Sequence, residues 1–210
     1  SAQVTTSYYD NSLRLYRTVL PDGASVTNLY HLSGQKRLEY GARTYPVGYG
    51  YDSQGRLTRM TNWSAFPDQG ERVTAWNYDP ATGWLSSKAY PDATGPSYGY
   101  TTAGRLSSRT WARNSGLQTS YTPNFAGQVA SISYSDGTTP SVSTTYDRQG
   151  RPATVVQGGM TATKFNDAAG NLLGEAYTGG VLDGLRITNQ FDHLQRRTNL
   201  ALITAQGTTL

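Results

Sequence analysis

The chain of 210 residues contains 28 Thr, 23 Gly and 16 Tyr but three Glu, three Lys and two Met. Tyr and Thr fit sheets and Gly fits turns, whereas the scarce Glu, Lys and Met favour helices. This composition excludes a mainly helical protein. The absence of Cys excludes disulfides, thiolate metal sites and cysteine nucleophiles. The net charge of +4 would suit nucleic acid, but the 15 Arg are spread from Arg14 to Arg197 without a basic run, and a nucleic-acid site needs a clustered stripe.

A short motif recurs along the chain, and its sharpest copy is Tyr-Asp-Ser-Gln-Gly-Arg-Leu at residues 51–57. Residues 146–152 repeat this copy except at the third and last positions, and residues 100–106 keep the aromatic, the Gly and the Arg-Leu pair. Weaker copies fill the gaps at intervals of 19 to 27 residues. Nine units are led by Tyr9, Tyr30, Tyr51, Tyr78, Tyr100, Tyr121, Tyr146, Phe165 and Phe191.

The other positions of the motif are a turn residue, a Gly and a basic residue. In chain order, these residues are Asp10, Gly34, Asp52, Gly55, Arg56, Asp79, Gly83, Gly104, Arg105, Gly127, Asp147, Gly150, Arg151, Gly170 and Asp192. The copies occupy residues 9 to 196 and leave no room for a second kind of domain. We therefore expect residues 1–210 to form a single repeat array.

Each unit predicts a β-hairpin. The aromatic residue ends a strand, Asp accepts backbone N–H groups in the turn, Gly supplies a positive φ, and Arg-Leu begins the next strand. A second turn signal lies between many copies, as in Leu-Pro-Asp-Gly at 20–23 and Ser-Asp-Gly at 135–137. Two turns in a period of roughly 22 residues leave two strands of about 6 to 8 residues. The sequence therefore predicts an all-β fold of 16 to 18 antiparallel strands, in which twist curls a long ribbon into a spiral or barrel-like strip.

At nine copies with near-constant spacing, the motif resembles the RHS or YD-repeat family. This family includes bacterial RHS polymorphic toxins, the C component of insecticidal Tc toxins, and animal teneurins. The resemblance implies strips of β-hairpins that spiral into a hollow shell, which in toxin members encloses a C-terminal toxic polypeptide. The chain is then expected to be a segment of shell wall from a larger secreted or cell-surface bacterial protein, with the remaining repeats and the C-terminal cargo as partners.

Toxin members of this family also cleave themselves near an Asp-Pro-x-Gly-Leu sequence. The sole Asp-Pro of this chain, Asp79-Pro80, lies inside a repeat unit and predicts a turn. Neither a signal peptide nor an apolar run of the roughly 20 residues needed to span a membrane is present in this sequence.

Catalytic residues are few. His31 and His193 both fall in the repeat turns, and Glu39, Glu71 and Glu175 are scattered. A Ser-His-Asp hydrolase or a carboxylate-pair glycosidase would need convergent groups that this pattern does not provide. We expect a protein that is not an enzyme and has neither a cofactor nor a metal site.

The alternative hypothesis is a carbohydrate-binding or cell-adhesion module. Aromatic rings offer flat apolar faces to sugars, and Arg and Asp offer directional hydrogen bonds. The candidates for stacking on a glycan are the four tryptophans, which lie close to repeat units; the competing interpretation is that their rings pack between repeats. These residues are Trp63, Trp76, Trp84 and Trp111.

Overall fold

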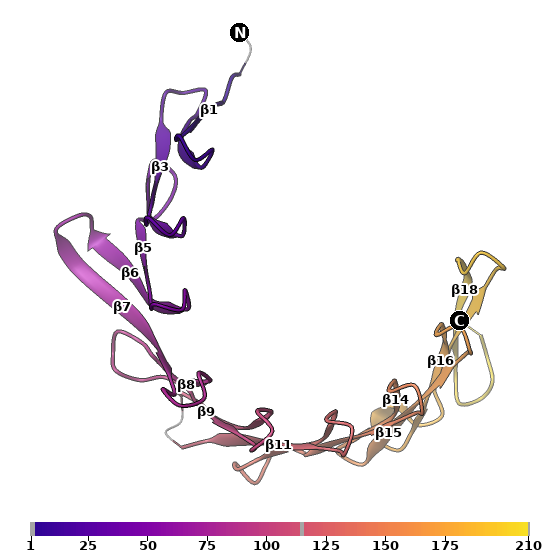
Figure 1. Ribbon diagram of the computed structural model, residues 1–210. Helices are drawn as coiled ribbons and strands as arrows, with labels where there is room; N and C mark the ends of the chain where they lie inside the picture. The colour runs from indigo at the N-terminus through magenta and orange to yellow at the C-terminus, as the bar shows by residue number, and fades with distance from the viewer. Residues whose placement is uncertain (1–2, 114–115, 210) are drawn as a thin grey trace. The chain divides into compact units, whose positions relative to one another are not determined.

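The computed structural model describes residues 3–113 and 116–209 and confirms the all-β prediction. It contains 18 strands of 4 to 10 residues, and the helical structure in the described residues is one turn of 3₁₀ helix, η1 (Gly180–Leu182). No helix among those residues is long and apolar enough to cross a membrane. The chain divides into two compact units, Ser1–Ser97 and Tyr98–Leu210, and both consist of the same hairpins (Figure 1).

The first unit contains eight complete strands, and β9 starts at its last residue. The strands are β1 (Thr6–Tyr9), β2 (Leu15–Val19), β3 (Ser25–Tyr30), β4 (Lys36–Gly41), β5 (Val47–Tyr51), β6 (Leu57–Ala65), β7 (Gln69–Tyr78) and β8 (Leu85–Ala89). The β6–β7 hairpin is the longest and extends beyond its neighbours (Figure 1).

The second unit holds nearly all of β9 and the nine strands that follow it. These are β9 (Ser97–Tyr100), β10 (Leu106–Thr110), β11 (Gln118–Pro123), β12 (Val129–Tyr134), β13 (Val142–Tyr146), β14 (Pro152–Gln157), β15 (Met160–Asn166), β16 (Leu172–Thr178), β17 (Arg186–Phe191) and β18 (Arg197–Ile203).

Within each unit, strands that follow one another in the sequence pair antiparallel. In the β5–β6 hairpin, for example, Tyr49 faces Met60, and the register then shifts by one residue at Tyr51, which faces Leu57. The same shift occurs beside the repeat turn in the hairpins that begin with β1, β3, β7, β11, β13, β15 and β17. This repeated bulge results from the conformation of the turn.

The repeat turn has one backbone geometry. In residues 52–56, the Asp52 N–H donates to the Arg56 carbonyl at 3.0 Å, and the Gly55 N–H donates to the Asp52 carbonyl at 3.0 Å. Gly55 adopts a φ of 79°, the left-handed value that closes a three-residue hairpin loop. The same two bonds form in the turns at residues 10–14, 31–35, 101–105, 124–128, 147–151, 167–171 and 192–196, and with one inserted residue at 79–84.

Three more turns share this geometry without the full motif. Residues 20–24 and 90–94, which belong to the second class of turn signal, form the same two backbone bonds. Residues 204–208 form a tenth copy of the repeat turn, with Gly207 at a φ of 79°. The motif does not predict this copy, because Thr204 replaces the Asp and Ile203 replaces the aromatic residue.

The expectation that an aromatic residue ends each strand is wrong at two units. Pro123 and Asn166 are the last residues of β11 and β15. Tyr121 and Phe165 lie earlier in those strands, so the interval between the aromatic and the turn is not constant. The turn itself forms in both places, and the position of the aromatic residue is therefore not what determines it.

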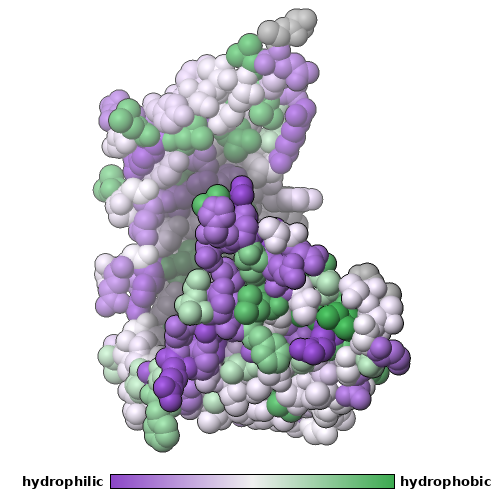
Figure 2. Space-filling view, turned by 90° about the vertical axis from the view of Figure 1, so that its right-hand side faces the viewer, coloured by the Kyte–Doolittle hydropathy of each residue, from purple (hydrophilic) through white to green (hydrophobic). Residues whose placement is uncertain are grey.

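Within residues 3–113 and 116–209, the hairpins form no thick hydrophobic core. Ala162 is the buried hydrophobic residue among the described residues, and the buried polar ones are Asn28, Thr61, Thr74 and Thr119. Most strand residues are half-buried, and hydrophilic and hydrophobic residues are interspersed on the face seen in Figure 2.

Close backbone packing makes the strand glycine Gly174 critical. A Cβ on Gly174 would lie 2.5 Å from the Ile187 carbonyl oxygen of the paired strand, whereas a Cβ on Gly50 would meet the Arg59 Cβ at 3.3 Å. We predict that Gly174→Ala lowers the free energy of unfolding by about 2 kcal/mol, because backbone must move to relieve the contact. Gly50→Ala, the matched control, should change it by less than ~1 kcal/mol, and equal losses in urea unfolding would contradict the prediction.

Candidate functional site

The carboxylate of the repeat turn binds both backbone and side chain. The Asp52 Oδ1 atom accepts the N–H groups of Gln54 at 3.0 Å and Arg56 at 2.9 Å, and its Oδ2 accepts the Arg56 Nε–H at 2.7 Å. Matching sets of bonds form in the turns that begin at Asp10, Asp147 and Asp192. The Asp therefore closes its own turn and orients the Arg that follows.

These contacts lower the pKa of the turn carboxyl groups. For Asp10, Asp147 and Asp192, the main cause is the backbone N–H of the Arg four residues later, and the Arg side chain adds to it. For Asp52, desolvation is the largest influence and raises the pKa, but the hydrogen bonds from Arg56 and Gln54 outweigh it and leave the pKa lowered. All four groups therefore favour the charged form in the folded protein.

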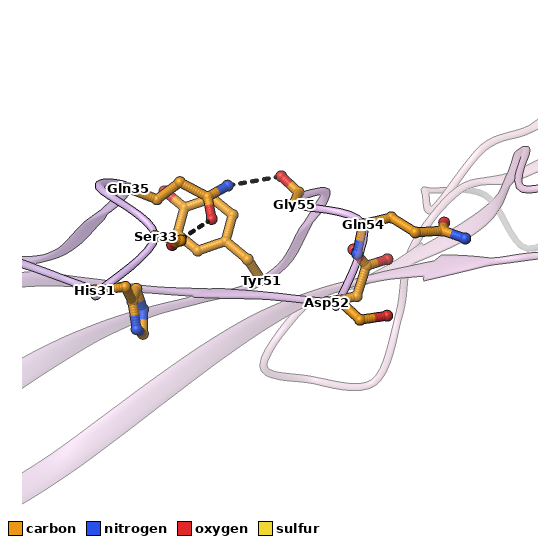
Figure 3. Close-up of a pocket in the computed structure, with 8 residues that line it drawn as sticks. His31, Ser33, Gln35, Tyr51, Asp52, Gln54 and Gly55 are labelled. Atoms are coloured by element: carbon orange, nitrogen blue, oxygen red, sulfur yellow. Dashed lines mark hydrogen bonds between the residues drawn. The ribbon is translucent and has the colours of Figure 1, made fainter.

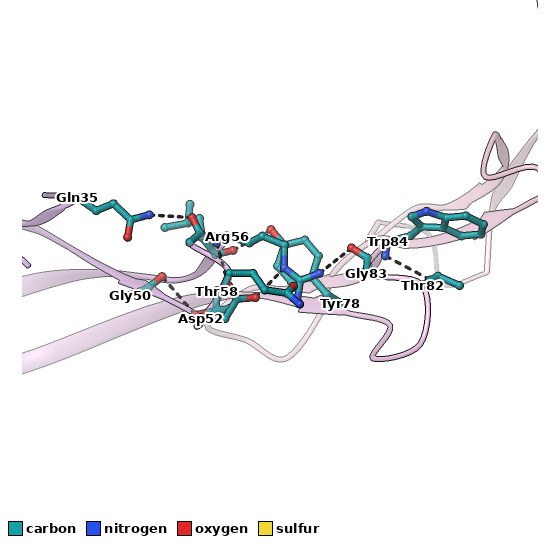
Figure 4. A network of polar contacts seen from close by, with 12 residues as sticks. Gln35, Gly50, Asp52, Arg56, Thr58, Tyr78, Thr82, Gly83 and Trp84 are labelled. Atoms are coloured by element: carbon teal, nitrogen blue, oxygen red, sulfur yellow. Dashed lines mark hydrogen bonds and ion pairs between the residues drawn. The ribbon is translucent and has the colours of Figure 1, made fainter. Parts of the chain in front are cut away.

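Arg56 then reaches forward to the next repeat (Figure 4). The Arg56 Nη1 donates to the Gly83 carbonyl at 2.9 Å, and the guanidinium carbon lies 4.3 Å from the centre of the Tyr78 ring. The Tyr78 hydroxyl donates back to the Leu57 carbonyl at 2.9 Å. One guanidinium thus connects a carboxylate in its own turn to the ring and backbone of the following unit.

The same connection recurs elsewhere. Arg14 stacks on Tyr30 at 4.8 Å and donates to the His31 carbonyl at 3.2 Å, and the Tyr30 hydroxyl donates to the Leu15 carbonyl at 2.7 Å. In the second unit, Arg151 donates to the Asp167 carbonyl at 2.9 Å. We call this series of contacts between successive turns the turn ladder.

Glutamine replaces the Arg in two turns of the ladder. The Gln35 amide donates to the Gly55 carbonyl at 2.8 Å, and the Gln128 amide donates to the Gly150 carbonyl at 2.7 Å. The Tyr146 hydroxyl also keeps its bond, at 2.7 Å, to the Val129 carbonyl. Glutamine therefore preserves one hydrogen bond of the ladder but not its charge.

A groove of about 450 Å³ lies between two of these turns (Figure 3). It is lined by three residues of the turn at 31–35 and by residues 51–55. The His31 Nε2 lies 3.3 Å from the Tyr49 carbonyl, and the His31 and Tyr51 rings meet edge to face with their centres 5.8 Å apart. We call this feature the His31 groove.

The carboxylates considered for catalysis take part in ion pairs. Glu39 pairs with Lys36 at 2.6 Å, Glu71 pairs with Arg59 at 3.3 Å, and Glu175 pairs with Lys164. The Tyr177 hydroxyl also donates to Glu175 at 2.6 Å, and the Lys164 and Tyr177 hydrogen bonds lower the pKa of the Glu175 carboxyl group. His193 is an exposed turn residue directly after Asp192.

The four candidate tryptophans are half-buried. Trp63 meets Phe66 edge to face at 5.2 Å, and Lys88 lies 4.9 Å from the Trp76 ring. Trp84 follows Gly83 and immediately precedes β8.

Trp111 lies under the Arg109 guanidinium at 3.9 Å and donates its indole N–H to Thr119 at 2.8 Å. The rings of Trp63, Trp76 and Trp111 therefore have neighbours within the chain, and the sequence does not reveal these contacts.

Solved structures share the fold of this chain, but its sequence matches no known family. Neither a family model nor a curated protein matches the chain. The crystal structure of TcdB2-TccC3-TEV covers 99% of the chain with a TM-score of 0.67 and 13% identity. The Photorhabdus luminescens Tc holotoxin pore covers 96% with a TM-score of 0.59 and 12% identity. TcdB2-TccC3 without its hypervariable C-terminal region covers 96% with a TM-score of 0.54 and 11% identity.

This similarity confirms the predicted fold. The chain shares the antiparallel hairpin architecture of these Tc toxin chains and spans about one seventh of their length, 13 to 14%.

We predict that Arg56→Lys destabilises the protein by about 1–2 kcal/mol. A Lys cannot bind Asp52 and the Gly83 carbonyl while stacking flat on Tyr78, because it lacks the planar fork of a guanidinium. Urea unfolding measures the loss. The matched control is Arg72→Lys, at an exposed position of β7. This change should alter the free energy of unfolding by less than ~0.5 kcal/mol. Similar losses in both variants would contradict the role of Arg56 in the ladder.

The lowered Asp pKa values predict acid sensitivity. A carboxyl group whose pKa is lower in the folded than in the unfolded protein contributes its full stabilisation above the unfolded-state pKa of about 3.9. This stabilisation is lost as the pH falls through the pKa of the folded state. The urea midpoint should therefore fall as the pH is lowered below about 4.

Replacing Asp10, Asp52, Asp147 and Asp192 by Asn should flatten this pH dependence. Asn is compatible with the turn, since the Asn124 side chain already accepts the Gln128 N–H at 3.0 Å in the equivalent place. An unchanged acid transition in the fourfold variant would show that other groups cause it.

Proposed function

We propose that this chain is a non-catalytic segment of the wall of an RHS/YD-repeat shell, which encloses a C-terminal polypeptide of the parent protein. The observation that carries the proposal is a ribbon of hairpins without a thick core, joined from turn to turn by a repeated polar ladder. The likeness to Tc toxin chains supports the proposal.

A wall needs to be thin, continuous and extendable, and the hairpins supply these properties. The repeats that the ladder joins contact one another through the same few groups, so units can be added without a new kind of interface. Half-buried and exposed residues on the strands leave apolar surface for neighbouring polypeptide to cover. Leu200 and Leu202 of β18 illustrate this, since they are 56% and 36% exposed along one strand.

The charged groups also favour a structural role. The turn aspartates bind their own backbone and Arg, and each of the three glutamates pairs with a cation. A catalytic acid or base must be free to exchange a proton with substrate, whereas these groups stabilise the hairpins. The proposed partners are further repeats and the enclosed polypeptide, and the proposed location is the secreted or cell-surface part of a bacterial protein.

Protease protection in the full-length parent protein tests the proposal. We predict that the polypeptide outside the repeats resists a broad-specificity protease in the intact protein and is cleaved quickly when expressed alone. Equal cleavage rates would overturn the enclosure role.

A variant of the wall makes this test specific. Combining Arg56→Ala with Arg151→Ala removes two links of the ladder, and the enclosed polypeptide should then be cleaved faster at unchanged protease activity. Arg72→Ala is the matched control and should leave protection intact.

A further inference from the structure

The His31 groove lies where the turn ladder lacks its guanidinium. In the preceding link, Arg14 occupies the space between the turn at 10–14 and the turn at 31–35, over the Tyr30 ring. In the following link, Arg56 occupies the equivalent space over Tyr78. Between those two links, the turn at 31–35 carries no Arg, and a groove of about 450 Å³ is found there.

Two residues of the turn at 31–35 depart from the repeat motif and leave room for the groove. Gln35 stands at the position of the Arg and is shorter; its amide nitrogen donates to the Gly55 carbonyl at 2.8 Å, and its Oε1 accepts from Ser33 at 3.0 Å. His31 stands at the position of the Asp. Its Nε2 faces the Tyr49 carbonyl at 3.3 Å; because a carbonyl oxygen only accepts, this contact favours the tautomer in which Nε2–H donates and Nδ1 is an acceptor.

The remaining groups resemble the surroundings of the chain's own guanidinium groups. Tyr51 is the ring that corresponds to Tyr30 and Tyr78, and it lines the groove. The Asp52 carbonyl corresponds to the His31 carbonyl that Arg14 binds, and it keeps a second lone pair beyond its bond to the Gly55 N–H. An aromatic ring surrounded by oxygen and nitrogen acceptors suits a planar cation with several N–H donors.

We propose that the His31 groove binds the arginine side chain of a partner polypeptide, which supplies from outside the guanidinium that this turn lacks. The guanidinium stacks on Tyr51 and donates to the Asp52 carbonyl and to His31 Nδ1. Arginine is favoured over lysine because its flat fork can stack and donate in two directions at once, whereas an ammonium is a point charge. The proposal is independent of the enclosure role and does not fail with it.

An NMR titration of the whole chain with N-acetyl-arginine methylamide tests this inference. We expect saturable shifts of the backbone amides in residues 31–35 and 51–55, with an affinity about fivefold higher than for N-acetyl-lysine methylamide. Methyl glucoside serves as the neutral comparator. Absence of saturation, equal affinity for lysine, or shifts produced by the glucoside in place of the arginine compound would overturn the proposal.

Two variants of the same turn locate the binding. Gln35→Arg supplies the guanidinium from within the chain and should abolish the shifts, whereas Gln128→Arg, the matched change in the turn at 124–128, should leave them unchanged. His31→Asp adds the carboxylate found in the other turns and should tighten binding. Shifts that persist in Gln35→Arg, or weaker binding in His31→Asp, would contradict the assigned site.

Discussion

The rest of this fold depends on one interaction, the contact that an arginine side chain makes between two successive turns. Its Nε is held by the Asp of its own turn, as Arg56 is by Asp52 at 2.7 Å, and its Nη1 reaches the backbone of the next turn. The ring of the next aromatic residue lies beneath it, and the hydroxyl of that ring returns a hydrogen bond. Sequence-local and inter-repeat contacts therefore meet at one group.

This arrangement compensates for what a single layer of hairpins cannot provide. Full burial of a large apolar side chain stabilises a protein by roughly 1.5–3 kcal/mol, but Ala162 is the buried hydrophobic residue among those described. A hydrogen bond contributes about 1 kcal/mol net and an exposed cation–π contact about 0.5–1 kcal/mol. Repeating such small terms at many of the turns gives stability that grows with the number of linked units, as expected for repeat proteins.

The motif predicts the turns well because their chemistry is local. Asp at the first position, Gly at the fourth and Arg at the fifth determine the backbone bonds within five residues, and the strands between the turns follow from their spacing. Where the side chains differ, the turn survives: Thr204 and Gly207 form it without an aromatic residue or an Asp. The sequence pattern was therefore stricter than the physical requirement.

The contacts between turns could not be predicted, because they join residues about 16 to 27 positions apart. The sequence contains Gln35 and His31 as simple departures from the motif, and the structure shows that together they leave a groove between two turns. Likewise, the sequence leaves open whether the tryptophans stack on a glycan or pack between repeats, whereas in the structure Trp76 and Trp111 contact side chains of the following strand that pairing brings close. Local chemistry determines the hairpin, and the pairing of hairpins determines the site.

A double-mutant cycle between Arg56 and Tyr78 tests the central claim most directly. The free energy of unfolding in urea would be measured for Arg56→Gln, Tyr78→Leu and the combined variant. If the ladder joins the repeats through this pair, the two effects are non-additive, with a coupling energy of about 1 kcal/mol. Additive effects, with a coupling energy below ~0.3 kcal/mol, would show that the repeats are held together by other contacts.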